Sequence, residues 1–167
     1  NGKYDLKKLS TKLHNYPNLE FRDLASEVST KDTFIWSKDE KKKIDEKKVQ
    51  IKKRNFIAVL DFGVKKNILR LLEETGFQVV VFPTDFDTNK IINLKPCGIF
   101  LSNGPGDPFT TYEKNKKNLD VLFKNRIPIF GICLGHQILA LAHKANTEKM
   151  HHGHRGGNHP IKNLINN

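Results

Sequence analysis

One cysteine lies in a pattern that suits nucleophilic catalysis. Cys133 stands between two glycines in the run Gly131-Ile-Cys-Leu-Gly135, which follows a short apolar segment and precedes a helix-like one. This G-x-C-x-G pattern predicts a nucleophile elbow, a sharp turn whose flanking residues must be small because neighbouring chain crowds them. The start of the helix favours the thiolate, and the amide of Leu134 is placed to donate to an oxyanion. A buried structural cysteine is the alternative, which the strand, the turn and both glycines together disfavour.

A second loop has a composition that fixes an unusual backbone course. It reads Ser102-Asn-Gly104-Pro-Gly106-Asp-Pro108, with two glycines and two prolines in seven residues. Such a loop can present N–H groups toward the end of a neighbouring strand, which suits the second donor of an oxyanion hole. Taken alone, it could equally be a surface turn.

Both loops need a regular framework, and the apolar pattern from Asn55 onward predicts one. Short apolar runs indicate strands at 56–60, 78–82, 98–101 and 127–130, and amphipathic runs indicate helices at 64–75, 112–124 and 134–143. Because apolar strands alternate with helices, we predict an α/β fold: an open, mostly parallel sheet with helices on both faces. Ligands bind such sheets at the carboxyl ends of the strands, where both loops lie.

The chain divides into three zones by composition. Residues 1–36 are too few to fold alone. Residues 37–54 contain nine basic and four acidic residues with almost no apolar face, so we predict a charged linker. Residues 55–167 are expected to form the domain that carries the chemistry, and Cys97, next to a predicted strand, is expected to be a core residue.

The net charge of +11 over 167 residues could indicate a nucleic-acid or acidic-membrane partner. Of the basic residues 24 are Lys and 5 are Arg, and the 37–54 zone supplies +5 of the total. No aromatic or arginine stacking surface accompanies this charge. We therefore interpret it as a solvated surface and expect no nucleic-acid partner.

Other sequence features indicate the cellular compartment. No apolar run approaches the roughly 18–20 residues of a membrane span, so we expect no membrane insertion. The start is not an initiator Met and has no signal-peptide pattern. Two cysteines cannot form a disulfide framework, so a reducing, cytoplasmic setting is expected.

Together, the two loops resemble those of the class-I (triad) glutamine amidotransferases. Two further stretches, Leu60-Asp-Phe-Gly-Val-Lys-Lys-Asn-Ile-Leu-Arg70 and residues 149–160, resemble the carbamoyl-phosphate synthetase small-subunit family. Residues 19–36 are similar to the tail of the N-terminal domain in that family. The resemblance spans most of the chain apart from the linker. It implies a flavodoxin-like fold, with residues 1–36 as the end of an N-terminal domain and residues 55–167 as a glutaminase domain.

The resemblance also implies roles for individual residues. Cys133 would attack the side-chain amide of L-glutamine, form a thioester and release ammonia. The backbone N–H groups of Gly104 and Leu134 would form the oxyanion hole and touch the substrate, and Gly106 and Gln137 would help to hold it. The ammonia would pass to a large synthetase subunit or fused region that makes carbamoyl phosphate for pyrimidine and arginine synthesis. ATP, Mg²⁺ and K⁺ would belong to that partner, and we expect no metal or cofactor in this chain.

The sequence departs from the family pattern in one respect. The family base is a His with a Glu two residues later, but none of the six His after Cys133 has a carboxylate at that spacing, and Glu148 is the one acid there. The His151–His159 cluster lacks carboxylate or Cys companions, which disfavours a metal site. We expect truncation at both ends, so that these 167 residues alone hold a nucleophile without its base and have negligible glutaminase activity.

Alternatives remain open at this point. Another triad amidotransferase, such as an anthranilate or GMP synthase, is one, and a non-catalytic chain that only docks on a synthetase is another. Asp61-Phe-Gly63 matches the magnesium motif of protein kinases, but no Gly-rich loop or catalytic loop precedes it. We interpret that match as accidental.

Overall fold

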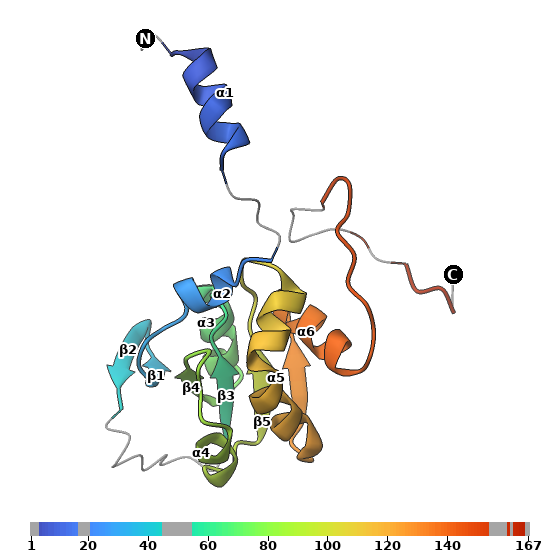
Figure 1. Cartoon of the computed structure of the whole chain (residues 1–167). Coiled ribbons are helices and arrows are strands. Elements are labelled where there is room, and N and C mark those ends of the chain that lie inside the picture. Colours follow the sequence, from blue (N-terminus) through green and yellow to red (C-terminus); the bar gives the residue numbers. More distant parts are fainter. Residues whose placement is uncertain (1–3, 17–20, 45–54, 154–159, 161, 166–167) are drawn as a thin grey trace.

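The computed structural model describes residues 4–16, 21–44, 55–153, 160 and 162–165, and its elements are shown in Figure 1. The strands are β1 (Phe34–Ser37), β2 (Glu40–Lys43), β3 (Phe56–Leu60), β4 (Gln78–Phe82), β5 (Gly98–Leu101) and β6 (Ile129–Gly131). The helices are α1 (Leu6–His14), α2 (Leu24–Val28), α3 (Lys66–Glu74), α4 (Thr88–Asn93), α5 (Pro108–Lys124) and α6 (Leu134–Ala142). Among these described helices, none is long and apolar enough to cross a membrane.

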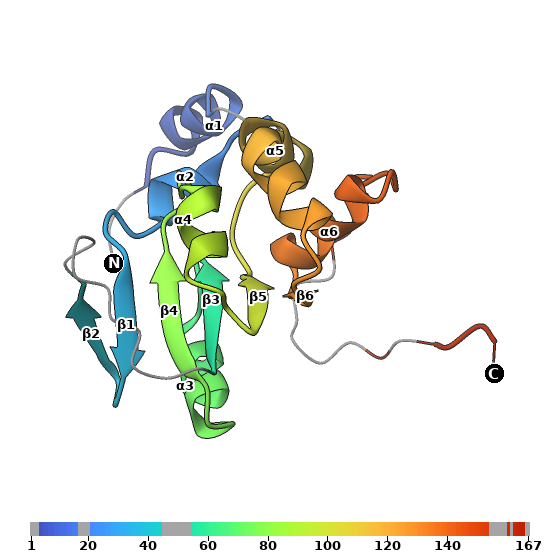
Figure 2. The same cartoon turned by 90° about the horizontal axis from the view of Figure 1, so that it is seen from below.

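The strands form one sheet in the order β2-β1-β4-β3-β5-β6, which Figure 2 shows. Strands β4, β3, β5 and β6 are parallel, and β1 runs antiparallel to β2 and β4. Three predicted strands are confirmed at their predicted residues. The fourth begins two residues late, because Pro128 has no N–H to pair, although its carbonyl still accepts a hydrogen bond from the Ile99 N–H at 2.9 Å.

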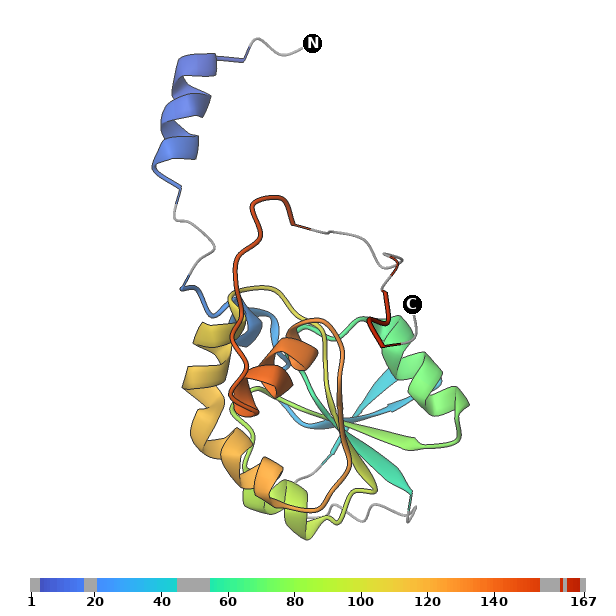
Figure 3. The same cartoon turned by 90° about the vertical axis from the view of Figure 1, so that its right-hand side faces the viewer.

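Helices cover both faces of the sheet, as predicted (Figure 3). Helix α3 lies on one face, and helices α2, α4, α5 and α6 contribute to the core on the other. Successive residues of β4 point to opposite faces: Val80 joins the larger core, whereas Val79 and Val81 join the smaller one with Leu69 of α3. This two-sided burial explains why the strands are apolar throughout.

The α3 side of the sheet is open next to β6. An apolar groove of about 600 Å³ is lined there by residues of α3, β5 and β6, and the Phe130 side chain is 63% exposed. Cys97 lines this groove and is exposed, so the prediction of a core residue was wrong. The reason is its place before β5, at the rim of the sheet, where its Sγ donates to the Phe56 carbonyl at 3.0 Å.

The prediction of a linker at 37–54 is wrong for residues 37–43. Residues 34–43 form a β-hairpin that adds two strands to the sheet. Phe34 and Trp36 alternate inward onto the α3 side and are nearly fully buried. Lys38 and Asp39 make the turn with φ of 52° and 64°, the left-handed conformation of a two-residue hairpin turn. Residues 45–54 of the predicted linker lie outside the described residues.

Three helices differ most from the prediction, α5, α4 and α1, and an aspartate caps the first turn of each. Helix α5 begins at Pro108, four residues earlier than predicted, since Asp107 caps its first turn and proline suits that position. Helix α4 was not predicted; it is six residues long and capped by the Asp87 side chain. Helix α1 lies apart from the sheet in Figure 1, and none of its residues is buried.

Candidate active site

Strand β6 meets helix α6 in a sharp turn at Cys133, at the residues predicted to form an elbow. Cys133 is the N-cap residue of α6, with φ 55° and ψ −114°. Few residues with a side chain adopt this backbone conformation, which costs roughly 1–3 kcal/mol. The Cys133 side chain is exposed. A strained turn that presents an exposed thiol at the start of a helix is the geometry that nucleophilic attack requires.

Close packing requires both glycines of the elbow. A Cβ on Gly131 would lie 2.5 Å from the carbonyl carbon of Gly135. A Cβ on Gly135 would overlap the carbonyl oxygen of Leu101 at the end of β5. Backbone atoms surround both positions, so no side-chain rotation could relieve either contact. The turn can therefore form only with glycine on each side of Cys133.

The two residues predicted to supply the oxyanion donors come close to each other. A Cβ on Gly104 would overlap the Phe62 carbonyl and lie 3.0 Å from Cδ2 of Leu134, which places the second loop against the start of α6. Within the described residues, neither the Gly104 nor the Leu134 amide donates a hydrogen bond. Two amides that donate to no described residue are available to a bound anion.

The two residues predicted to hold a substrate lie in the same two segments as the predicted oxyanion donors. Gly106 has a φ of +100° in the same loop as Gly104. Gln137 lies in the first turn of α6, where its N–H donates to the Cys133 carbonyl at 3.0 Å and its side chain is exposed. Their contact with glutamine stays a prediction.

Asp61 has a structural role. Its buried carboxylate accepts hydrogen bonds from the N–H groups of Gly63 (2.9 Å), Val64 (2.8 Å) and Thr30 (2.8 Å). These three bonds fix the loop after β3 and tie it to the N-terminal segment. The kinase-like match at this position is thus explained by loop geometry.

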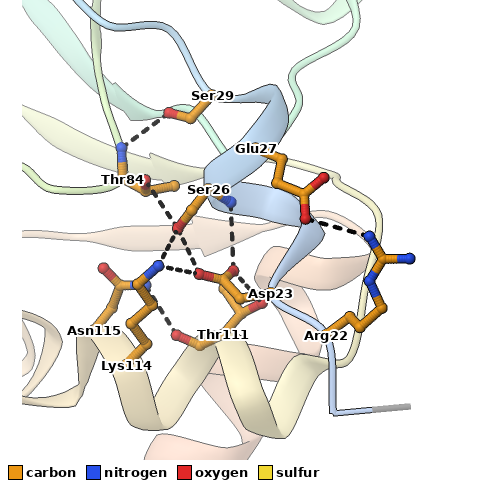
Figure 4. Close-up of polar contacts among 9 residues, drawn as sticks. All are labelled: Arg22, Asp23, Ser26, Glu27, Ser29, Thr84, Thr111, Lys114 and Asn115. Carbon is orange, nitrogen blue, oxygen red and sulfur yellow. Dashed lines mark hydrogen bonds and ion pairs between the residues drawn. The ribbon is translucent and has the colours of Figure 1, made fainter. Parts of the chain in front are cut away.

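A segment before the sheet supports the loop that carries Gly104. The Asp107 N–H donates to the Arg22 carbonyl at 3.3 Å, and a Cβ on Gly106 would lie 2.9 Å from that same oxygen. Further along, the Ser29 Oγ accepts a hydrogen bond from the Thr84 N–H at 3.0 Å. Residues 22–29, which we call the strap, therefore contact both this loop and the segment after β4. Figure 4 shows the strap beside α5.

Asp23 is the centre of the polar contacts that hold the strap (Figure 4). Its carboxylate accepts from the Ser26 N–H (3.3 Å), the Thr111 hydroxyl (3.2 Å) and the Lys114 ammonium (2.8 Å). Burial alone raises the pKa of Asp23, but the hydrogen bonds from Lys114 and Ser26 and the Lys114 charge outweigh it and lower the pKa below its ordinary value. The charged form of Asp23 is therefore favoured in the folded chain.

We expect Asp23→Asn to lower the free energy of unfolding by roughly 1 kcal/mol at pH 7, because asparagine still caps α2 but loses the Lys114 ion pair, whose lysine is largely exposed. A folded pKa below the unfolded one stabilises at pH values above the unfolded pKa, and this contribution is lost as pH falls through the folded pKa. The difference between variant and wild type should therefore shrink in acid. Urea unfolding from pH 7 to pH 2 measures both effects.

The matched control for this prediction is Glu113→Gln, which breaks an exposed pair with Lys116 on the same helix. We expect its effect to stay within about 0.5 kcal/mol at every pH. An Asp23→Asn protein as stable as Glu113→Gln at pH 7 would contradict the role given to Asp23.

None of the described histidines is paired with a carboxylate beside Cys133. His136 is exposed on α6, and the Nδ1 of His143 lies 2.9 Å from the Leu139 carbonyl. His151 and His152 contact each other edge to face at 4.3 Å between ring centroids, and the rest of that cluster lies outside the described residues. No group of three metal-ligating side chains occurs within the described part of the chain.

The sequence is similar to a known protein family and to curated proteins of one name. The family model described as "Glutamine amidotransferase class-I" matches residues 58–166. The "Carbamoyl phosphate synthase small chain" of Bartonella bacilliformis is 46% identical over 167 residues, covering 99% of this chain and 41% of that protein. The protein of the same name from Brucella ovis is 44% identical over 162 residues, covering 97% and 40%. The chain thus spans about two fifths of the length of these curated relatives.

Proposed function

Because the chain belongs to the class-I glutamine amidotransferase family, we propose that it is the glutamine-hydrolysing part of a carbamoyl phosphate synthase. The turn at Cys133 is the observation that carries the proposal, since it presents an exposed thiol next to the Leu134 amide, which donates to no described residue. The similarity to two carbamoyl phosphate synthase small chains over nearly the whole sequence supports this particular member of the family.

The proposed reaction begins with attack of the Cys133 thiolate on the side-chain carbonyl carbon of glutamine. The oxygen of the tetrahedral intermediate gains negative charge, and the Gly104 and Leu134 amides donate to it. Collapse breaks the C–N bond, a proton passes to the leaving nitrogen, and ammonia and a thioester result. Water then attacks the thioester and releases glutamate. Gly106 and Gln137 would hold the substrate during both steps.

The ammonia would be consumed by a large synthetase subunit or fused synthetase region. In this proposal ATP, Mg²⁺ and K⁺ bind to that partner, and this chain uses neither metal nor cofactor. The product would be carbamoyl phosphate, for pyrimidine and arginine synthesis. A reduced nucleophilic thiol suits a cytoplasmic setting.

A second candidate is a non-catalytic chain that only docks on a synthetase. The observation that favours it is that, among the described residues, neither His136 nor His143 is paired with a carboxylate. The two candidates differ in whether glutamine is recognised at Cys133.

Selective alkylation separates these candidates. A chloroketone analogue of glutamine is expected to label Cys133 and spare Cys97, because only the elbow thiol lies beside groups that bind the substrate. Iodoacetamide is the control and should label both thiols, since both are exposed. Peptide mass spectrometry of the complete natural protein that contains this sequence measures the labelled sites. Equal labelling of the two thiols by the analogue would count against the glutaminase.

A further inference from the structure

The side chain of Asn103 fastens the loop that carries Gly104 to the loop after β3. Its Nδ2 donates to the Gly63 carbonyl at 2.9 Å, and its Oδ1 accepts from the Lys65 N–H at 3.1 Å. One amide side chain thus pairs with a donor and an acceptor of the neighbouring backbone. These bonds fix where the loop lies.

Ser102, the residue before, is fully buried and links three segments. Its Oγ accepts a hydrogen bond from the Phe62 N–H at 2.9 Å and donates to the Asn103 carbonyl at 2.8 Å. Its backbone carbonyl accepts from the Gly135 N–H in the elbow at 3.0 Å. Ser102 therefore connects the loop after β3, its own loop and the start of α6.

The bond from Ser102 to the Asn103 carbonyl has a consequence for Gly104. The Asn103 carbonyl and the Gly104 N–H belong to one peptide unit, which is planar and trans. In such a unit the C=O and N–H point in opposite directions. Because the Ser102 hydroxyl binds the Asn103 carbonyl, the Gly104 N–H points away from that hydroxyl.

The loop that receives Ser102 is itself held firmly. Phe62 is fully buried, and the Asp61 carboxylate accepts three backbone N–H groups around it. The Phe62 N–H is a buried donor whose partner is the Ser102 Oγ. The Ser102 hydroxyl is therefore held by a loop that is itself fixed.

We propose that Ser102 is a positioning residue for glutamine hydrolysis: its hydroxyl orients the Asn103–Gly104 peptide so that the Gly104 N–H meets the oxyanion. This inference rests on the proposed glutaminase function. We expect the effect mainly on kcat and much less on KM, because the negative charge on the substrate oxygen is largest in the transition state.

Ser29 offers a matched control at the end of the strap that contacts Thr84, whereas the loop that carries Gly104 meets the strap at the Arg22 carbonyl. It is also a buried serine, its Oγ accepts from the Thr84 N–H at 3.0 Å, and it donates to the carbonyl of the next residue, Thr30, at 3.3 Å. Its hydroxyl thus makes the same two kinds of hydrogen bond as that of Ser102. The Ser29 hydroxyl binds the carbonyl of Thr30, however, and does not touch the peptide unit that precedes Gly104.

The experiment compares Ser102→Ala and Ser29→Ala in the complete natural protein. Both should show a similar fall in Tm, since each leaves a buried N–H without its acceptor. For Ser102→Ala we expect kcat for ammonia release from glutamine to fall by roughly 10- to 100-fold, somewhat less than for loss of an oxyanion donor, with KM changed less than threefold. For Ser29→Ala, kcat should stay within about twofold. Iodoacetamide should label Cys133 at equal rates in both, because that reaction forms no oxyanion.

Equal kcat values for the two variants would overturn the role of Ser102 while leaving the glutaminase intact. A wild-type protein that releases no ammonia would overturn the proposed function, and this inference with it. If Ser102→Ala does not fold, Ser102→Cys replaces it. Because a thiol is a weak hydrogen-bond donor, we expect about a tenfold loss of kcat, and an unchanged kcat would overturn the proposal.

Discussion

Exchange of Cys133 for serine is expected to abolish ammonia release from glutamine, with a loss of at least about 10³-fold in kcat. Serine is close in size to cysteine, so the strained turn at φ 55° should persist. A hydroxyl loses its proton far less readily than a thiol, however, and the anion is the species that attacks. Glutamate formation by the complete natural protein measures the effect.

The control for this exchange is Cys97→Ser. Cys97 is also exposed, but it precedes β5 at the opposite end of the strands from the elbow. We expect its glutaminase activity to stay within about twofold of the wild type. With free ammonia supplied, Cys133→Ser should still support carbamoyl phosphate synthesis by the proposed partner. Glutamine hydrolysis by Cys133→Ser would show that another group is the nucleophile.

Gly135→Ala is expected to destabilise the protein by about 3 kcal/mol or more and to remove activity, because overpacking against fixed backbone is among the costlier core changes. The added Cβ would overlap the Leu101 carbonyl oxygen and lie 2.7 Å from the Leu101 Cβ. Relief requires α6 to move away from β5, and that movement would carry Cys133 away from Gly104. Denaturant unfolding and ammonia release measure the two consequences.

Gly98→Ala is the matched substitution within β5. A Cβ there would meet the Pro128 carbonyl oxygen at 3.6 Å, an ordinary contact. We expect a change of less than about 1 kcal/mol and normal activity, since alanine suits a strand at least as well as glycine. If Gly135→Ala unfolds at the same denaturant concentration as Gly98→Ala, the packing described for the elbow is incorrect.

Local patterns were sufficient to predict the central strands and the elbow. Each of the strands β3, β4 and β5 consists mainly of a short apolar run followed by a polar or turn residue, Asp61, Pro83 or Ser102, so its end can be predicted from the sequence. The elbow is equally local, since the need for Gly131 and Gly135 arises from a single turn. The turn that carries the proposed nucleophile could therefore be predicted from the sequence alone.

Features that depend on distant contacts could not be predicted in this way. The hairpin turn at Lys38 and Asp39 carries none of the glycine or asparagine that usually marks such turns. The strap depends on Asp23 meeting Lys114, 91 positions further along the chain. The hydroxyl of Ser102 gains its partner, the Phe62 N–H, only when two loops come together.

The hairpin strand β2 has a consequence for the behaviour of concentrated protein. It forms an outer edge of the sheet, and all four of its residues, Glu40–Lys43, are exposed. An uncovered edge strand is a template on which other molecules can extend the sheet. Here three successive lysines occupy that edge, and bringing two such edges together would force like charges against each other in a poorly hydrated space. Part of the positive charge of this chain thus opposes self-association into intermolecular β-structure.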